Sequence, residues 1–337
     1  MKKWAYLFVF ALPITVFVAF NLSGILTFLP IFIFYGLLPL LELVIPANHL
    51  NPVNIEERKL SKYFDILLYL AVPVQVGFLF YFFKVINAPH TNIEYVGMTL
   101  SMGLMCGVFG INIAHELGHR YTWHEQLMAE ILLLTSLEMH FIPYHNNGHH
   151  HNVATTNDPA TARKNEPVYT FWFRSQIGSY IEAWKLEHKR LKQKGKAIFS
   201  FSNKALRYSI IQILFITAIF YLYDPKVLIF FIMAAGFGIL LLETVNYIEH
   251  YGLLRKKNDS GRYERVQHQH SWNSDHPLGR AMLFELSRHS DHHYKASKKY
   301  QTLISLPENP QMPTGYPGMM LFSLIPPLWF RTMNKQL

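Results

Sequence analysis

HSDHH, at residues 289–293, places three histidines within five positions of the chain. Each imidazole carries two ring nitrogens that need partners once the side chain is buried, so packing alone rarely requires three of them together. Imidazole is, in contrast, one of the commonest metal ligands in proteins. The stretch therefore predicts a metal site, and a fold that brings further ligands to the same place.

Three further clusters carry histidines at spacings that suit a shared site. HELGHR at 115–120 and HNNGHHH at 145–151 each contain a pair four residues apart, which lies on one face of a helix. NYIEHYG at 246–252 adds one more, and the remaining residue of the second cluster, His151, is expected to face solvent. The predicted metal ligands are His115, His119, His145, His149, His150, His250, His289, His292 and His293. This set is too large for one ion.

Long apolar runs occupy much of the remaining chain. Half of the 337 residues are hydrophobic although the formal net charge is +9, so apolar and charged residues must be segregated. A helix needs about 20 apolar residues to cross the hydrocarbon core of a bilayer. Six runs approach this length: 4–20, 25–46, 66–83, 95–114, 208–223 and 227–248. We therefore predict an all-α integral membrane protein in which residues 1–337 form a single membrane-embedded domain.

Other interpretations of individual runs are weaker. A buried helix of a soluble protein can be equally apolar, but six such runs make that interpretation unfavourable. The first run could be a signal peptide, yet it lacks an Ala-x-Ala cleavage site and a second run follows almost at once. The stretch 127–143 contains Glu130, Glu138 and His140, so we expect a helix at the membrane interface rather than a seventh span.

The distribution of basic residues predicts the orientation in the membrane. With the N-terminus inside, only Lys84 and Lys226 of the 31 lysines and arginines lie on the outer side. Basic residues are retained on the cytoplasmic side of membranes. All histidine clusters then belong to a cytoplasmic cap. The basic peak at 188–196 indicates a face near anionic lipid or an acidic partner, and without interleaved aromatic residues it does not indicate nucleic-acid binding.

Two features of the apolar part bear on packing and on the metal. The run 95–114 is rich in glycine and methionine, which predicts close helix packing or, alternatively, room for a slender apolar guest. The same run contains Cys106, the single cysteine of the chain. An internal disulfide and a cysteine-ligated centre built by this chain alone are therefore excluded.

Two chemistries fit the histidines. HELGH matches the zinc motif H-E-x-x-H, in which Glu116 would be the general base of an intramembrane protease. A catalytic zinc needs only three protein ligands and a water, however, so the other histidines would have no purpose. Two ions of higher coordination number, with open positions for oxygen, account for them better, and imidazole suits iron.

The motifs and their order resemble one family. HELGHR, HNNGHH with NVATTNDPATAR, NYIEHYGLLR, HSWNSDH and SRHSDHHYKASKKYQTL are similar to the membrane-bound alkane 1-monooxygenases of the fatty-acid desaturase and hydroxylase superfamily, over about 95–330. NYIEHYG and the residues flanking the other boxes favour these hydroxylases over a desaturase or another hydroxylase of the superfamily, which remain the alternatives. Tyr144, where the family commonly has Glu, and 295–299 depart from the pattern.

The resemblance implies a reaction and its partners. A six-helix bundle would hold two non-haem iron ions on the nine histidines. The reaction would insert one atom of O2 into a terminal C–H bond of an alkane to give a primary alcohol. Electrons would come from a rubredoxin-type donor with its reductase, a separate protein because rubredoxin needs four cysteines and this chain has one. The expected location is the bacterial cytoplasmic (inner) membrane, in contact with lipid, with the active site at the cytoplasmic face.

Four carboxylates lie within or near the histidine clusters. A histidine that binds a metal usually donates its other ring N–H to a carboxylate, which fixes the tautomer and the ring orientation. We expect this role, rather than direct metal binding, for Glu116, Asp158, Glu249 and Asp291. Iron would perform the oxidation, while the chain positions an apolar substrate that enters from the lipid and keeps water out.

Overall fold

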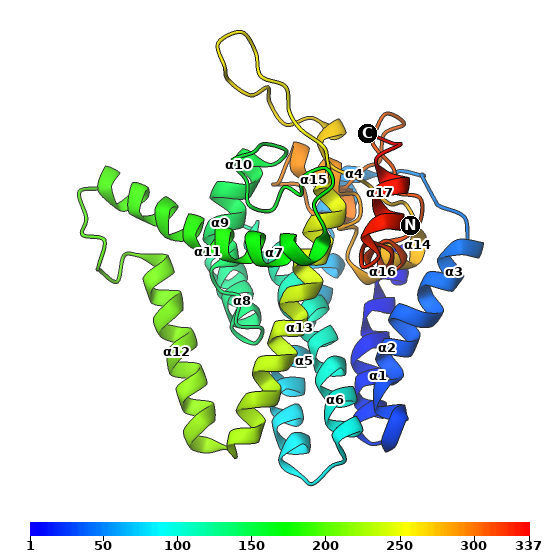
Figure 1. The fold of residues 1–337 in the computed structure, drawn as a ribbon, viewed down its shortest axis with the longest axis vertical. Helices are drawn as coiled ribbons and strands as arrows, with labels where there is room; N and C mark the ends of the chain where they lie inside the picture. The colour runs from blue at the N-terminus through cyan, green and yellow to red at the C-terminus, as the bar shows by residue number, and fades with distance from the viewer.

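The computed structural model describes residues 1–337, and it is helical throughout, with two isolated β-bridges and no sheet. Six helical segments are long and apolar enough to cross a membrane, and each contains most of one predicted run. They are Lys3–Phe20, Gly24–Val44, Ile55–Asn87, Asn92–Gly118, Lys204–Leu222 and Pro225–His250. These segments run side by side below a cap that also carries both chain termini (Figure 1). The predicted all-helical fold with six candidate spans is therefore confirmed.

The first two spans form a hairpin of irregular helices. The first contains α1 (Ala11–Phe20), and the second joins α2 (Leu29–Ile31) to α3 (Leu38–Val44) through a π-helical segment, Phe32–Leu37. Pro39 lies in the first turn of α3. Proline has no N–H for the regular helical hydrogen bond, so the chain passes it with a widened turn.

The third and fourth spans contain α5 (Lys62–Asn87) and α6 (Asn92–Met105). A capping box starts α6, because the side chain of Thr91 accepts from the N–H of Glu94 while Glu94 accepts from the N–H of Thr91. Such a cap stabilises a helix by about 1 kcal/mol. The fourth span then continues through a π-helical segment, Cys106–Asn112, into α7 (Ile113–Gly118). It is therefore longer than the predicted 95–114 and itself carries the first histidine cluster.

The last two spans are α12 (Lys204–Leu222) and α13 (Pro225–His250). Helix α13 packs closely on the fourth span, where a Cβ atom added to Gly238 would lie 2.7 Å from the Cβ of Cys106. A Cβ on Gly103 would similarly lie 2.6 Å from the ring of Phe237. Small residues permit such close approach of membrane helices. The predicted role of the glycines in helix packing is confirmed, and the C-terminal end of α13 is thereby held beside α7.

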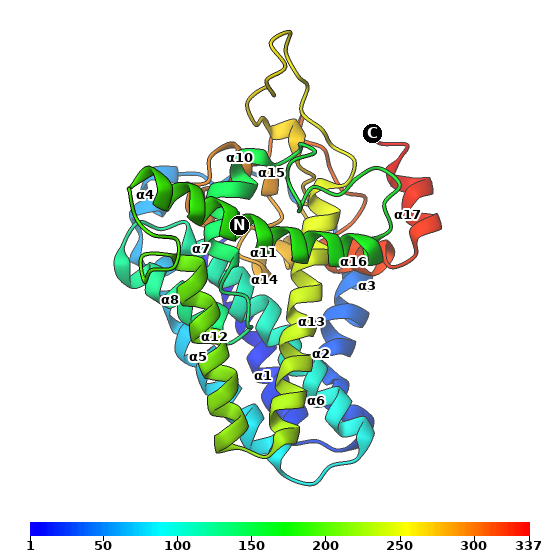
Figure 2. The ribbon, with the colours of Figure 1, turned by 60° about the vertical axis from the view of Figure 1, so that its left-hand side comes forward.

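The cap is built from short helices and one long one. Helix α11 (Val168–Gln193) lies across the ends of α12 and α13 (Figures 1 and 2). The stretch 127–143, predicted as one helix, contains the end of α8 (Trp123–Leu134), a turn and the start of α9 (Phe141–Tyr144). The remaining helices are α4 (Ile55–Leu60), α8 (Trp123–Leu134), α9 (Phe141–Tyr144), α10 (His150–Asn152), α14 (Pro277–Met282), α15 (His289–Tyr294), α16 (Tyr316–Ser323) and α17 (Pro326–Met333).

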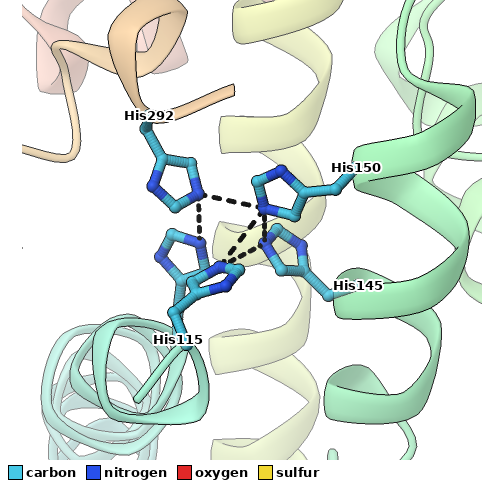
Figure 3. Close-up of side chains that lie close together, drawn as sticks. His115, His145, His150 and His292 are labelled. Carbon is cyan, nitrogen blue, oxygen red and sulfur yellow. Dashed lines mark hydrogen bonds between the residues drawn. The ribbon is translucent and has the colours of Figure 1, made fainter. Parts of the chain in front are cut away.

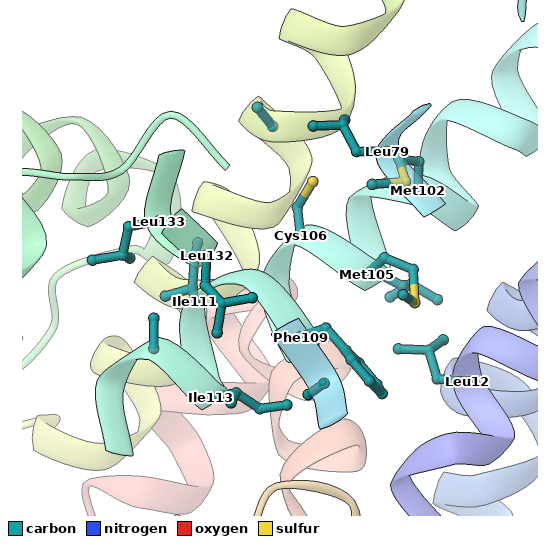
Figure 4. Close-up of a cluster of buried hydrophobic side chains, with 14 of the residues drawn as sticks. Leu12, Leu79, Met102, Met105, Cys106, Phe109, Ile111, Ile113, Leu132 and Leu133 are labelled. Carbon is teal, nitrogen blue, oxygen red and sulfur yellow. The ribbon is translucent and has the colours of Figure 1, made fainter. Parts of the chain in front are cut away.

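The apolar core runs from the spans into the base of the cap. Side chains of the first, third and fourth spans and of α8 interdigitate around Met105 and Phe109, as Figure 4 shows. Lipid is as apolar as these side chains, so close packing rather than exclusion from water holds the spans together. A second core in the cap packs Trp272 and Trp329 around Tyr247 and Tyr251 at the end of α13. The histidine clusters lie between these two cores.

Candidate metal centre

All nine predicted ligands come together, in two groups. The five-histidine group consists of His115, His119, His145, His150 and His292, and the four-histidine group consists of His149, His250, His289 and His293. Within each group the candidate ligand atoms lie within 4.8 Å of one another. Figure 3 labels His115, His145, His150 and His292 of the five-histidine group, whose rings converge from different parts of the chain. The one other histidine of these clusters, His151, is exposed, as predicted.

The local backbone aims these rings. A π-helical segment precedes α7, and another, His145–His149, carries the second cluster. The third cluster ends α13, and α15 forms the last. Arg288, immediately before α15, is fully buried and donates to Asp275 (3.0 Å) and to the carbonyls of Leu303 and Leu50 (3.0 Å each). This arginine ties α15 to the segments on either side of it and fixes the histidines that follow.

The spacing of the ring nitrogens distinguishes two kinds of metal site. Two imidazoles about 2.1 Å from one ion lie about 3.0 Å apart at a right angle and about 3.4 Å apart at a tetrahedral angle. The Nε2 to Nε2 distances are 3.0 Å for His115 and His292, 2.9 Å for His145 and His150, 3.1 Å for His150 and His292, 2.8 Å for His289 and His293, and 3.2 Å for His250 and His289. The donor set therefore fits ions with octahedral angles better than tetrahedral zinc.

Metal binding requires neutral imidazoles, and burial favours this form. Burial, together with the neighbouring imidazoles, lowers the pKa of His145, His150 and His293 well below the ordinary value. A neutral imidazole keeps a lone pair on one ring nitrogen, so several converging Nε2 atoms present lone pairs to a common point. Such a cluster is unfavourable without a cation at its centre, because the lone pairs repel one another.

Asp158 contacts the outer ring nitrogen of a predicted ligand. Its Oδ2 lies 2.9 Å from His149 Nδ1 and accepts from the hydroxyl of Thr161 (2.7 Å), while its Oδ1 accepts from the hydroxyl of Tyr144 (2.6 Å). Burial by itself raises the pKa of Asp158, but His149 and these hydrogen bonds outweigh it and lower the pKa to about 2. The carboxylate is ionised, and Nε2 of His149 faces the four-histidine group. Tyr144, whose departure from the family pattern is noted above, is one of the groups that hold it.

The other three carboxylates have different partners. Glu249 lies 3.1 Å from Nε2 of His289, the nitrogen that faces the four-histidine group, so it borders the group itself. Its other oxygen accepts from the hydroxyl of Tyr316 (2.9 Å). Asp291 binds Lys298 (2.7 Å) and His268 (3.1 Å). Of the four, only Asp158 reaches an outer ring nitrogen of a predicted ligand.

The protease interpretation of HELGH depends on Glu116. This carboxylate accepts from the guanidinium of Arg120 at 2.6 Å and from the N–H of Tyr300 at 3.3 Å. A general base must be free to take a proton from a metal-bound water. Glu116 is instead occupied by an ion pair, and both histidines of the motif belong to a larger group than a catalytic zinc uses.

Sequence reasoning missed several polar residues around the groups. Tyr144, Tyr316 and Arg288 each hold a carboxylate or a backbone segment of the centre. Arg288 and Tyr144 carried a signal in the sequence, since they directly precede HSDHH and HNNGHHH. Tyr316 could not be distinguished from the other 18 tyrosines in the chain without knowing which of them reach the site.

An apolar cavity ends on the histidines. Its volume is about 900 Å³, counted with its open mouth, and its wall includes Phe34, Leu104, Val108, Leu241, Val245 and Met320. Its polar end is formed by His115 and His145 of the five-histidine group and His289 of the four-histidine group. A slender apolar molecule from the membrane could therefore reach both groups.

Comparison with known proteins places this arrangement in a family. The family model described as fatty acid desaturase matches residues 93–322. Alkane 1-monooxygenase of Ectopseudomonas oleovorans is 41% identical over 313 residues, which cover 92% of this chain and 78% of that protein. Alkane 1-monooxygenase 1 of Alcanivorax borkumensis is 39% identical over 308 residues, which cover 90% of this chain and 76% of that protein.

A more distant relative acts on another kind of molecule. The hydroxylase component XylM of xylene/toluene monooxygenase from Pseudomonas putida is 29% identical over 291 residues, which cover 84% of this chain and 77% of that protein. The resemblance seen in the motifs thus extends over nearly the whole chain, including the spans that carry no histidine. The protein belongs to the fatty acid desaturase family and, within it, to the group of the alkane 1-monooxygenases.

Proposed function

We propose that the protein is a non-haem di-iron monooxygenase of the membrane that inserts one atom of O2 into a terminal C–H bond of an alkane or a similar apolar chain, giving a primary alcohol. One observation carries the proposal: the apolar cavity ends on histidines of both groups. A substrate with no polar handle can be oriented only by the shape of such a cavity. Its chain would lie along the wall, with one end at the histidines.

The proposal assigns one iron to each group. The octahedral-type spacing and the purely imidazole donor set support iron, for which imidazole is a good ligand. When bound, the irons supply the redox chemistry that activates O2 and oxidises the C–H bond. The chain supplies the rest: Asp158 holds the ring of His149, Glu249 lies at the edge of the four-histidine group, and the apolar wall excludes water.

The reaction is tested with octane and ¹⁸O2 on the purified protein in lipid nanodiscs, supplied with rubredoxin and its reductase. Gas chromatography with mass spectrometry should find 1-octanol carrying one labelled oxygen. A new carbon–carbon double bond without label would instead indicate a desaturase. Labelled product at internal carbons would leave the monooxygenase class in place and overturn the terminal position.

The metal is tested separately by elemental analysis of the detergent-purified protein. We expect about two irons per chain, because there are two groups. His289→Ala should lower the iron content. The control His151→Ala should not, because His151 is exposed and belongs to neither group. About one zinc per chain, unchanged by His289→Ala, would contradict the assignment.

We also propose that the electron donor is a separate rubredoxin-type carrier that docks on the cap. The loop after α13 projects furthest from the spans (Figures 1 and 2), and it exposes Lys256 and Lys257. Acidic carriers associate faster with such basic surfaces, and salt weakens the effect. Changing Lys256 and Lys257 to Glu should slow electron transfer from rubredoxin at low salt, measured by stopped flow. Lys226→Glu, at the opposite end of the spans, is the matched control.

The proposed location is the bacterial inner membrane with the cap in the cytoplasm. The only native cysteine, Cys106, is buried, so single-cysteine labelling is unobstructed. Ser260→Cys in the projecting loop should react with an impermeant thiol reagent only in inverted vesicles, and Ala88→Cys, between α5 and α6, only in right-side-out cells. The reverse pattern would place the cap outside.

A further inference from the structure

A second buried polar cluster lies beside the metal centre, among helices that are otherwise apolar. It contains two carboxylates, Glu138 and Glu243, which are 1% and 2% exposed. Neither pairs with a lysine or an arginine, and the one ionic partner of Glu138 is His140, at 3.2 Å. Ionisable groups at membrane depth are costly and usually mark function. Neither glutamate belongs to the two histidine groups of the metal centre.

The contacts of the cluster form a line. The ring of His140 packs against Tyr180 of α11, which is 41% exposed, and its Nε2 lies 3.3 Å from the hydroxyl of Ser179. The amide of Gln176 donates to Glu138 at 2.8 Å. The exposed face of α11 is thus connected through His140 to Glu138.

The line continues from Glu138 toward the cavity. Helix α11 contacts both places: Gln176 donates to Glu138, and Trp172, one turn earlier, donates at 3.0 Å to Thr244, the neighbour of Glu243. Asn246 donates to Glu243 at 3.4 Å and itself lines the cavity. The fully buried hydroxyl of Ser175 on α11 lies beside Glu243. Polar groups therefore reach from the surface of α11 to the wall of the cavity.

The protonation of Glu138 suits this position. Burial raises its pKa to about 8, against the hydrogen bond from Gln176 and with a further contribution from Glu243. At neutral pH this carboxyl carries a proton that it can give up. Three other ionisable groups face Glu243 from neighbouring segments: Tyr144, Asp158 and Arg174.

The proposed reaction needs protons at a buried site. One alkane, one O2, two electrons and two protons give one alcohol and one water: the C–H carbon is oxidised, one oxygen atom enters the C–H bond, and the other is reduced to water. The electrons come one at a time from the protein carrier. Imidazoles bind a metal in their neutral form, so the ligand histidines are not a ready source of these protons.

We propose that His140, Glu138 and Glu243 form a proton path from the surface of α11 to the cavity wall at Asn246, which supplies the two protons consumed in each turnover. The proposal rests on the proposed monooxygenase function. The path residues act through one another and do not touch the substrate, so their role is to relay protons. Loss of one carboxyl should leave binding of iron and substrate intact.

The first test compares Glu138→Gln and Glu243→Gln with a matched control, Glu130→Gln. Glu130 is also a glutamate among the helices, where it accepts from Tyr208, but it has no contact with the path. Proton transfer by a positioned side chain typically accelerates a reaction by about 10²-fold or more. We expect each path variant to lose between about tenfold and a hundredfold in turnover, with a larger solvent deuterium isotope effect and unchanged iron content. Glu243→Asp should restore part of the turnover.

The dependence of turnover on pH is a second test of the path. Wild-type turnover should fall as the pH rises through about 8, where Glu138 loses its proton, and this decline should be absent in Glu138→Gln. The carboxyl group can also be observed without metal or turnover. Infrared spectra of the metal-free protein should show a protonated-carboxyl band that titrates near pH 8 and disappears in Glu138→Gln.

The outcomes separate the path from the reaction. If both variants keep the wild-type turnover, isotope effect and pH profile, the path is overturned. An infrared band that titrates in the ordinary range of glutamate would also overturn it. If the wild type makes no labelled alcohol while the band titrates as expected, the proposed function is wrong, but the protonated state of the buried Glu138 carboxyl is confirmed. Iron content and gel filtration identify a variant that has merely misfolded, and Glu243→Asp then provides the comparison.

Discussion

The five-histidine and the four-histidine groups are built from the same ligand type but differ in their surroundings. In the five-histidine group His119 and His150 are partly exposed, whereas every ring of the four-histidine group is 5% exposed or less. The two nearest carboxylates, Asp158 and Glu249, both contact the four-histidine group. One position thus relies on the number of its imidazoles, and the other has fewer imidazoles and depends on carboxylates that contact them. The two metals should not be equivalent.

Removing one ligand from each group gives the largest test of this difference. We expect His289→Ala to abolish turnover and to release about one iron per chain, because three imidazoles remain around that position. His119→Ala leaves four imidazoles and should retain most of the iron at lowered activity. Iron content and labelled-alcohol yield, measured on the same preparations, check both results. Equal losses in the two variants would mean that the groups are equivalent.

Asp158→Asn keeps the shape of the side chain and removes its charge. Loss of such a partner to a metal ligand typically costs about 10- to 100-fold in metal affinity or activity. We therefore expect weaker iron binding at the four-histidine position, measured by competition with a chelator. Glu187→Gln is the control, since Glu187 pairs with Arg190 on α11 and contacts no histidine of either group. A chelator titration that releases both irons together would argue against the carboxylate acting on one group.

The cavity borders both groups, and narrowing it tests how a substrate approaches them. Val108 lies on the wall, so Val108→Phe should shorten the usable length of the cavity. A contact worth one or two methylene groups changes selectivity by about tenfold. We expect the preference among alkanes to shift by about that factor toward shorter chains, measured by competition between two alkanes. Leu43→Phe is the control, because Leu43 is 70% exposed on the outside of α3.

Tyr316→Phe should have the smallest effect. It removes one hydrogen bond to Glu249, and a single such bond contributes about 1 kcal/mol, or roughly fivefold. We expect a loss of that size in turnover, with full iron content. A loss as large as that of Asp158→Asn would show that Glu249 acts more directly at the four-histidine group than its tyrosine partner suggests.

Much of the architecture could be predicted from the sequence because its signals are local. Runs of apolar residues locate the spans to within a few positions, and spacings of four residues place His115 with His119 and His145 with His149. The grouping of the ligands could not be predicted. His149 and His150 are adjacent in the chain yet belong to different groups, because neighbouring side chains on a helix point in different directions. The contacts of Glu116 and Asp291 could not be predicted either. Their partners are Arg120 and Lys298, whose side chains reach back from nearby turns.

The buried pair of Glu138 and Glu243 was equally invisible. In the sequence Glu138 argues only against a seventh span, and Glu243 is a single carboxylate within the apolar run 227–248. The two are more than 100 positions apart in the chain, and nothing local indicates that the packing of α11 on α13 brings them together. Long-range contacts between single polar residues are the part of the fold that periodicity and spacing do not report.

The widened helical turn at Cys106–Asn112 has a consequence for how this protein can change. Relative to a regular α-helix such a turn holds one extra residue, and one residue corresponds to a rotation of about 100°. Deleting a single residue there would turn α7 by about that angle and move His115 and His119 out of their group, although no ligand had been replaced. Single-residue deletions in this segment should therefore be as damaging as the loss of a ligand. In a variant library these deletions should group with the losses of a histidine, although the segment contains no ligand.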